Sequence, residues 1–198
     1  MDIGEGYRLL EAHHADLVEA RNRFGPVNFD GQDWDLSHLK PFAFKQEVKL
    51  TGGIKKELDV IVLFSCHCFT AAARPGDEVD PKHWYDDGHE TRVLNSARYE
   101  LSGRLLPKMI HDLPGREIRT TGGDQGNYMT LEIEGPDGEL KPYIAFFDVE
   151  RDKRRKGRVI LRVQSAYVRE DLGNRLKSGE KVNFHVLVRA AYEGKKIR

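Results

Sequence analysis

The sequence predicts an α+β fold with a predominantly antiparallel sheet, arranged as a meander in the C-terminal half and packed against helices. Strand-like segments separated by glycine-containing turns fill most of the chain after residue 115, and one strong helical stripe precedes them. No helical stretch between these strands is long enough for the crossover that joins parallel neighbours. We therefore expect antiparallel pairing.

The first 40 residues have the pattern of a helix followed by a connector. Apolar residues recur at helical spacing within residues 7–24, and the Gly-Pro pair that follows ends the segment. Residues 27–41 show no periodicity. We therefore expect residues 1–40 to form an N-terminal helical extension and connector, and residues 41–198 to form a single α+β domain.

Two strands, a loop and a helix are predicted next. Alternating apolar positions indicate a half-buried strand at 42–50. A second strand is predicted at 58–64, where the continuous apolar run at 60–64 suits a central strand. Residues 71–90, rich in Pro, Gly and Asp, predict a long irregular loop. Apolar residues at intervals of three and four from 91 to 113 predict a core-facing helix, which Pro107 should kink or divide.

The rest of the chain predicts a β-meander. Each segment is rich in β-branched or aromatic residues and is bounded by turn residues. The predicted strands are 116–121, 128–134, 142–149, 159–168 and 182–190.

Composition argues for a folded, strongly solvated protein that stays in the cytoplasm. Hydrophobic residues make up 39% and charged residues 32% of the chain, and no apolar run approaches the roughly 20 residues that span a bilayer. The N-terminus has no secretory pattern. Cys66 and Cys68 are too close in sequence to bridge to each other, which agrees with a reducing compartment.

Charge is divided unevenly along a chain whose net charge is zero. Residues 151–198 hold 15 Lys and Arg against 5 Asp and Glu. One interpretation is a phosphate-binding surface that uses the basic turn and nearby strands. The other is that the two halves of the chain neutralise each other, or that the turn is only a solvated face. The candidate contacts in the turn are Arg154, Arg155, Lys156 and Arg158.

The segment Cys66-His67-Cys68 ends an apolar strand, where a scaffold can present a reactive group. Two thiolates with His83 and His89 would make a tetrahedral zinc site. A cysteine nucleophile activated by a histidine from elsewhere is a second interpretation. In the third, two small thiols simply pack in the core.

A polar face on the last two predicted strands suggests RNA chemistry without a metal. If the strands 159–168 and 182–190 pair, one face gathers a histidine, two arginines and two amides. The histidine can exchange a proton with the 2′-hydroxyl or the leaving oxygen, and arginines can stabilise the phosphate. An open sheet face can equally be polar because it is wet. The residues of this face are Arg162, Gln164, Asn183, His185 and Arg189.

The strand Val159–Tyr167, coming after a helix and a meander, resembles a late strand of the barnase–EndoU–colicin–RelE-like ribonuclease toxins. The resemblance covers roughly residues 91–198 and implies that Ser165 and Tyr167 help to hold the phosphate. Both share the parity of the apolar positions, so they reach Arg162 and His185 only if a bulge interrupts the strand.

These observations predict a small metal-independent RNA-directed hydrolase of the toxin-like kind, which needs no cofactor. Its candidate catalytic residues are His185, Arg162, Ser165, Tyr167 and His67. The alternatives are a non-enzymatic regulatory or defence module that binds nucleic acid, a protein partner or an inhibitor, and a zinc protein built on Cys66 and Cys68.

Overall fold

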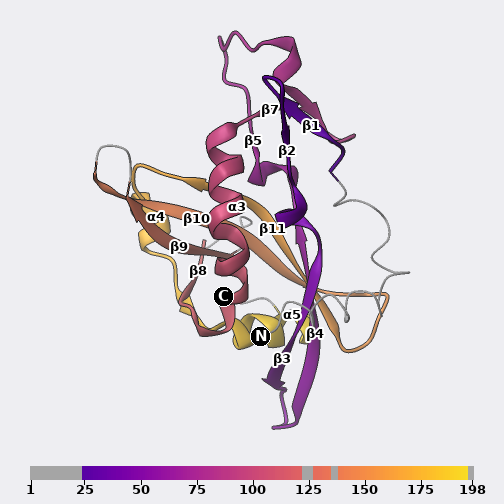
Figure 1. Ribbon diagram of the computed structural model, residues 1–198. Helices are drawn as coiled ribbons and strands as arrows, with labels where there is room; N and C mark the ends of the chain where they lie inside the picture. The colour runs from indigo at the N-terminus through magenta and orange to yellow at the C-terminus, as the bar shows by residue number, and fades with distance from the viewer. Residues whose placement is uncertain (1–23, 122–126, 135–137, 196–198) are drawn as a thin grey trace.

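A mixed sheet with the strand order β12-β8-β9-β10-β11-β4-β3 forms the frame of the protein in the computed structural model (Figure 1). The structure describes residues 24–121, 127–134 and 138–195. The strands of this sheet are β3 (Phe42–Lys49), β4 (Lys55–Phe64), β8 (Ile118–Thr120), β9 (Asn127–Glu134), β10 (Leu140–Arg151), β11 (Arg158–Val168) and β12 (Lys181–Val182).

The predicted α+β class is confirmed, and the predicted pairing is confirmed in all but one place. Every described strand pair is antiparallel except β11 with β4, which run parallel from Arg158 opposite Asp59 to Val163 opposite Phe64. The connection between these two strands contains a helix and the whole β8–β10 meander. The parallel pair was therefore not predicted, because no single crossover helix joins β4 to β11.

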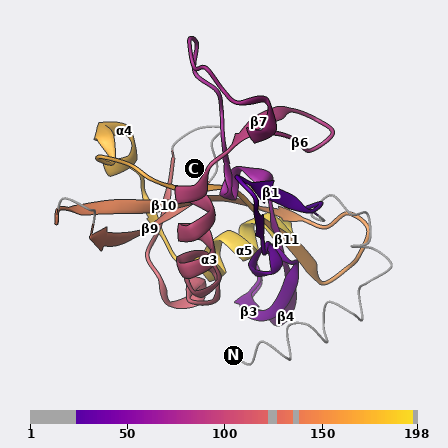
Figure 2. The same cartoon turned by 45° about the horizontal axis from the view of Figure 1, so that its top comes forward.

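Helices cover the two faces of the sheet differently. Helices α3 (Ser96–His111) and α5 (Phe184–Glu193) share the main core with the inward side chains of β4, β10 and β11, whereas Leu176 of α4 (Gly173–Lys177) packs on the other face beside Tyr128 and Ile144. Figure 2 shows α3 and α4 on opposite sides of the β9–β10 ribbon. We call these the α3 face and the α4 face.

The N-terminal connector takes part in the core. Residues 27–39 contain the β1–β2 pair (Val27–Phe29 and Gln32–Trp34) and the 3-10 turn η1 (Ser37–Leu39). Val27, Trp34 and Leu39 are all buried in the main core. The predicted helix at 7–24 lies almost wholly outside the described residues, and the domain boundary at residue 40 stays a prediction.

The predicted loop at 71–90 contains regular structure. A small sheet of order β5-β7-β6 is built from β5 (Thr70–Ala71), β6 (Trp84–Asp86) and β7 (Thr91–Leu94), with the turn η3 (Pro81–His83). It stands away from the large sheet, beyond the start of α3 (Figures 1 and 2). The predicted helix at 91–113 therefore begins only at Ser96, and it runs undivided through Pro107 to His111, before the turn η4 (Leu113–Gly115).

One predicted strand is wrong. Residues 182–190 form the end of β12 and most of helix α5. Phe184, Leu187 and Val188 are buried together, which is the three-and-four spacing of a helix and not the alternation of a strand. No helix within the described parts of the chain is long and apolar enough to span a bilayer.

Candidate active site at the end of strand β4

The 3-10 turn η2 (Cys66–Cys68) follows β4 directly and lies beside β11, which continues past the end of β4. The Ser65 backbone N–H donates to the Val163 carbonyl at 3.0 Å, and the Ser65 hydroxyl donates to the Gln164 carbonyl at 2.5 Å. The same hydroxyl caps the turn by accepting from the His67 backbone N–H at 3.1 Å. The turn is therefore fixed against β11 by its N-cap residue, Ser65.

The two cysteines are buried in this turn. The Cys66 thiol donates to Asp87 Oδ2 at 3.1 Å, and burial, followed by the Asp87 carboxylate, raises the pKa of Cys66 to about 12. Burial raises the pKa of Cys68 to about 12 as well. Because the thiolate is the nucleophilic form, these environments do not support the interpretation of a cysteine nucleophile at neutral pH.

The four predicted zinc ligands are not brought together. His83 stacks on Phe29 with ring centroids 4.5 Å apart and pairs with Asp30 at 3.0 Å. His89 lies exposed in the loop before β7. Across the described ranges, which include all four residues, no three His, Cys, Asp or Glu side chains are grouped closely enough to hold a metal ion.

His67 forms the centre of a charged group that joins η2 to the small sheet. Its Nε2 lies 2.5 Å from Glu90 Oε1, while Arg92 Nη1 donates to the other oxygen, Oε2, at 3.0 Å. Arg92 Nε also donates to the Thr70 hydroxyl at 2.9 Å. The hydrogen bond from His67, followed by that from Arg92, holds the pKa of Glu90 below its ordinary value. Glu90 thus stays a carboxylate and can orient the imidazole.

Arg98 adds a second cation to this group from the first turn of α3. The Asn95 side chain caps the helix by accepting from the Arg98 backbone N–H at 2.9 Å. Arg98 Nη1 donates to the carbonyls of His67 at 3.0 Å and Thr70 at 2.7 Å. The guanidinium lies over the Tyr167 ring, 4.6 Å from its centroid. Arg98 therefore connects η2 with the end of β11.

A β-bulge in β11 decides which side chains join this group. The pairing with β10 passes from Val163 opposite Phe147 directly to Ser165 opposite Phe146, so Gln164 is the extra residue. Such an insertion reverses the alternation of side chains along the strand. The bulge that Ser165 and Tyr167 need in order to share a face with Arg162 is therefore present.

Beyond the bulge, Ser165 and Tyr167 share the α4 face with Arg162. That face is not as basic as predicted, because Arg162 lies 3.6 Å from Glu150 and Gln164 Nε2 donates to Asp148 Oδ2 at 3.1 Å. The acidic partners come from β10 and could not be assigned before the strand register was known.

His185, Asn183 and Arg189 do not lie on this face. They belong to the start and body of α5, which packs on the α3 face through contacts such as Phe184 with Phe44, whose ring centroids are 5.9 Å apart. The predicted grouping of His185 with Arg162 depended on the strand at 182–190, and it fails with that strand.

The basic turn contains one residue that sequence reasoning placed wrongly. Arg158 is buried, and its Nε donates to buried Asp152 at 2.5 Å, so the pair closes the base of the β10–β11 hairpin. The Arg154 backbone N–H donates to the other oxygen of Asp152 at 2.8 Å. The side chains at 153–156 are exposed. The predicted cationic surface therefore keeps Arg154, Arg155 and Lys156 but loses Arg158.

Three residues of the His67 group were not predicted as site residues from the sequence: Glu90, Arg92 and Arg98. A signal existed for Arg92, because it occupies the same parity as buried Leu94 in β7 and an arginine in a core position requires a partner. Nothing in the sequence indicated Glu90 or Arg98, because they reach His67 only through the packing of η2 against β7 and α3.

Comparison with known proteins gives one match. The model of the YjaZ family matches residues 26–192. No curated protein matches this chain, and no solved structure does. The matched range spans every described helix and strand from β1 to α5 except the last residue of α5. The chain therefore belongs to the YjaZ family.

Proposed function

We propose that this protein is a metal-independent RNA-directed hydrolase whose active site is the group around His67, not the predicted group around His185. The observation that supports the proposal best is the His67–Glu90 pair, whose side chains are 30% and 45% exposed. Arg98, which lies over the Tyr167 ring, donates to the His67 carbonyl. The resemblance to ribonuclease toxins stays a prediction beside it.

In the proposed reaction His67 acts as the general base. It takes the proton of a ribose 2′-hydroxyl while the 2′-oxygen attacks the adjacent phosphorus and the bond to the 5′-oxygen breaks. The imidazolium then returns the proton to the departing 5′-oxygen, which leaves a 2′,3′-cyclic phosphate and a 5′-hydroxyl. Glu90 stabilises the imidazolium, and Arg98 stabilises the charge that develops on the phosphate.

The test is cleavage of end-labelled RNA in the presence and absence of EDTA. We expect cleavage to survive EDTA and to fall by at least about 100-fold in His67→Ala, since general acid–base catalysis supplies about 10²–10⁴-fold. Glu90→Gln should lose less activity, because it removes the charge but keeps the size of the side chain.

His185→Ala is the matched control, and we expect it to cleave like the unmodified protein. Loss of cleavage in His185→Ala together with full activity in His67→Ala would overturn the site assignment. Absence of cleavage from the unmodified protein under all conditions would overturn the hydrolase itself.

A second candidate, non-enzymatic nucleic-acid binding, is favoured by the tip of the β10–β11 hairpin. Four consecutive cations, residues 153–156, are exposed there above the buried Asp152–Arg158 pair. We expect filter binding to weaken with salt, and the slope of log affinity against log salt to fall by about 0.7–0.9 for each phosphate contact removed with Arg155 or Lys156. If the slope is unchanged in the variant with both Arg155→Ala and Lys156→Ala, the hairpin tip is excluded as the nucleic-acid-binding surface.

A further inference from the structure

Three aromatic rings form a row across the α4 face. Tyr128 of β9, Phe146 of β10 and Tyr167 of β11 lie on adjacent strands, with centroids 5.8 Å apart in each neighbouring pair. The rings of Phe146 and Tyr167 are inclined by only 26°. The bulge at Gln164 creates this row, because without it Tyr167 would point to the α3 face.

The row is covered at one end and open at the other. Tyr128 is buried beneath α4, where its hydroxyl donates to the Leu176 carbonyl. Phe146 and Tyr167 are only partly buried. The part that a ligand can reach is therefore the Phe146–Tyr167 pair, and the buried tyrosine supports it from the side.

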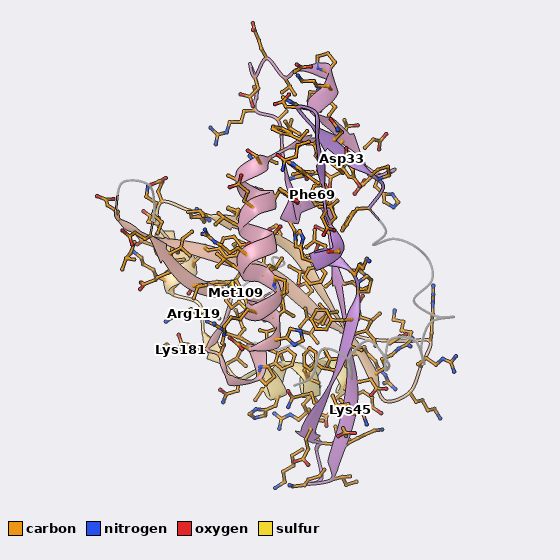
Figure 3. The ribbon with its side chains drawn as sticks, in the orientation of Figure 1. Asp33, Lys45, Phe69, Met109, Arg119 and Lys181 are labelled. Carbon is orange, nitrogen blue, oxygen red and sulfur yellow. The ribbon has the colours of Figure 1, made fainter. Side chains whose placement is uncertain are left out.

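A cation stands at one end of the row, where Arg98 lies over Tyr167 at 4.6 Å. At the other end Arg119, opposite Tyr128 in the β8–β9 pair, is already paired with Glu117 at 3.1 Å and donates to the Lys177 carbonyl at 3.0 Å. Arg119 and Tyr128 also line a small cavity of about 150 Å³ at that edge of the sheet, on the side where Figure 3 labels Arg119 and Lys181. Along β10, in contrast, Phe146 is followed by Asp148 and Glu150. A polyanion is therefore favoured to approach the Phe146–Tyr167 pair from the Arg98 end and not along β10.

We propose that the Phe146–Tyr167 pair is a stacking surface for the bases of single-stranded RNA. Exposed aromatic rings accept any unpaired base, whereas the bases of a duplex are already stacked on each other. Arg98 attracts the phosphates, and Tyr167 places the bound strand next to Arg98, which donates to the His67 carbonyl. This inference rests on the proposed function and names its substrate class.

The test is fluorescence anisotropy with a labelled 2′-O-methyl RNA oligonucleotide, used single-stranded and as a duplex of the same sequence. The methyl group blocks the attacking 2′-oxygen, so the probe measures binding in the absence of cleavage. Because stacking on one aromatic is worth at least a fivefold change in affinity, Phe146→Leu and Tyr167→Leu should each weaken single-strand binding by about fivefold or more. Leucine keeps the apolar volume, and circular dichroism checks the fold.

Tyr192→Leu is the matched control. Tyr192 also lies beside cations, with Lys56 at 4.8 Å and Arg151 at 5.3 Å from its ring, but it belongs to α5. We expect its single-strand affinity to stay within about twofold of the unmodified protein, since no stacked base is lost there.

Three outcomes separate this inference from the proposed hydrolase. Unchanged single-strand affinity in both Phe146→Leu and Tyr167→Leu would overturn the stacking surface, even if RNA is cleaved. Equal affinity of the unmodified protein for single strand and duplex would also overturn it. If the protein binds the single strand selectively and both variants weaken this binding, the stacking surface is supported. If ordinary RNA is not cleaved in that case, only the proposed hydrolase activity is overturned.

Discussion

The base of the β10–β11 hairpin and the group around His67 are both built on a carboxylate with a cationic partner, but they differ in burial. At the hairpin base, the Asp152 and Arg158 side chains are 4% and 1% exposed. In the His67 group, the imidazole and its Glu90 partner are 30% and 45% exposed. The first pair is shielded from solvent, whereas solvent can reach the second.

A charge pattern in the sequence therefore does not distinguish ion pairs that stabilise the core from charged side chains that stay accessible to solvent. Arg158 lies in the most basic stretch of the chain, yet it is buried and pairs with Asp152 at the base of the β10–β11 hairpin. Glu90 lies in an irregular, acidic stretch, yet it pairs with the partly exposed His67. Burial separates the two roles, because a buried charge deprived of its partner is costly and an exposed one is hydrated.

The largest effect is expected at the hairpin base. Asp152→Ala takes the carboxylate from a buried guanidinium, so it should lower the free energy of unfolding by about 3–5 kcal/mol, measured by denaturant titration. The double variant Asp152→Leu with Arg158→Met should be more stable than the single variant, because no buried charge is left. A single variant within about 1 kcal/mol of the unmodified protein would contradict the structural role of the pair.

An intermediate effect is expected at Arg92, which joins the buried and exposed parts of the His67 group. Arg92→Met removes the hydrogen bonds to Thr70 and Glu90 and should destabilise the protein by about 1–3 kcal/mol. Thermal unfolding measures the loss. If Arg92→Met lowered the free energy of unfolding as much as Asp152→Ala, the energetic difference between the two regions would not follow their difference in burial.

A smaller effect on stability is expected at His67 itself. His67→Ala removes a partly exposed ion pair, which is typically worth about 0–1 kcal/mol. Stability and RNA cleavage should therefore separate in this variant, with cleavage lost and the unfolding midpoint nearly unchanged. If denaturant titration gave a loss above about 2 kcal/mol, His67 would have to be reassigned to a structural role.

The fold was predictable where one periodicity dominated. Residues 159–163 alternate along a strand that is buried on one face, and β11 is confirmed there. Residues 182–188 also alternate, but Phe184, Leu187 and Val188 fit a helical stripe equally well. Gly194, in the left-handed conformation with φ 70°, ends the helix as a C-terminal glycine commonly does. That stop signal was present in the sequence and could have decided the case.

The candidate site was predictable only in part. His67 was named among the candidate catalytic residues. Tyr167 was named from the resemblance to ribonuclease toxins, with the bulge that admits it stated as a condition. Glu90 and Arg98 lie 23 and 31 residues from His67 in sequence, and the contact depends on the β5–β7 pairing and on the start of α3. Periodicity carries no information on such long-range pairing, so these partners required the structure.

The smallest effect is expected at Glu193, where an ion pair at the surface can be followed by pH. Its carboxylate accepts from the Thr51 backbone N–H at 2.6 Å and hydroxyl at 2.8 Å and pairs with Lys195 at 2.7 Å. The hydrogen bond from Lys195, followed by those from Thr51, lowers the pKa of Glu193 to about 2 from an ordinary 4.5. Between these values the unfolded chain binds more protons than the folded one, so stability must rise with pH.

The contribution of Glu193 is thus fully present above about pH 4.5 and is lost as the pH falls towards about 2. Glu193→Gln removes the titrating group, so its stability should fall less steeply than that of the unmodified protein across this range, measured as denaturation midpoints at several pH values. If the stabilities of the two proteins fell equally steeply between pH 4.5 and 2, the contact of Glu193 with Thr51 would not hold α5 to the β3–β4 turn. Above pH 5 the stabilities of the two proteins should differ least at high salt, because salt screens this pair, whose Lys195 side chain is 56% exposed, more than the buried pair at the hairpin base.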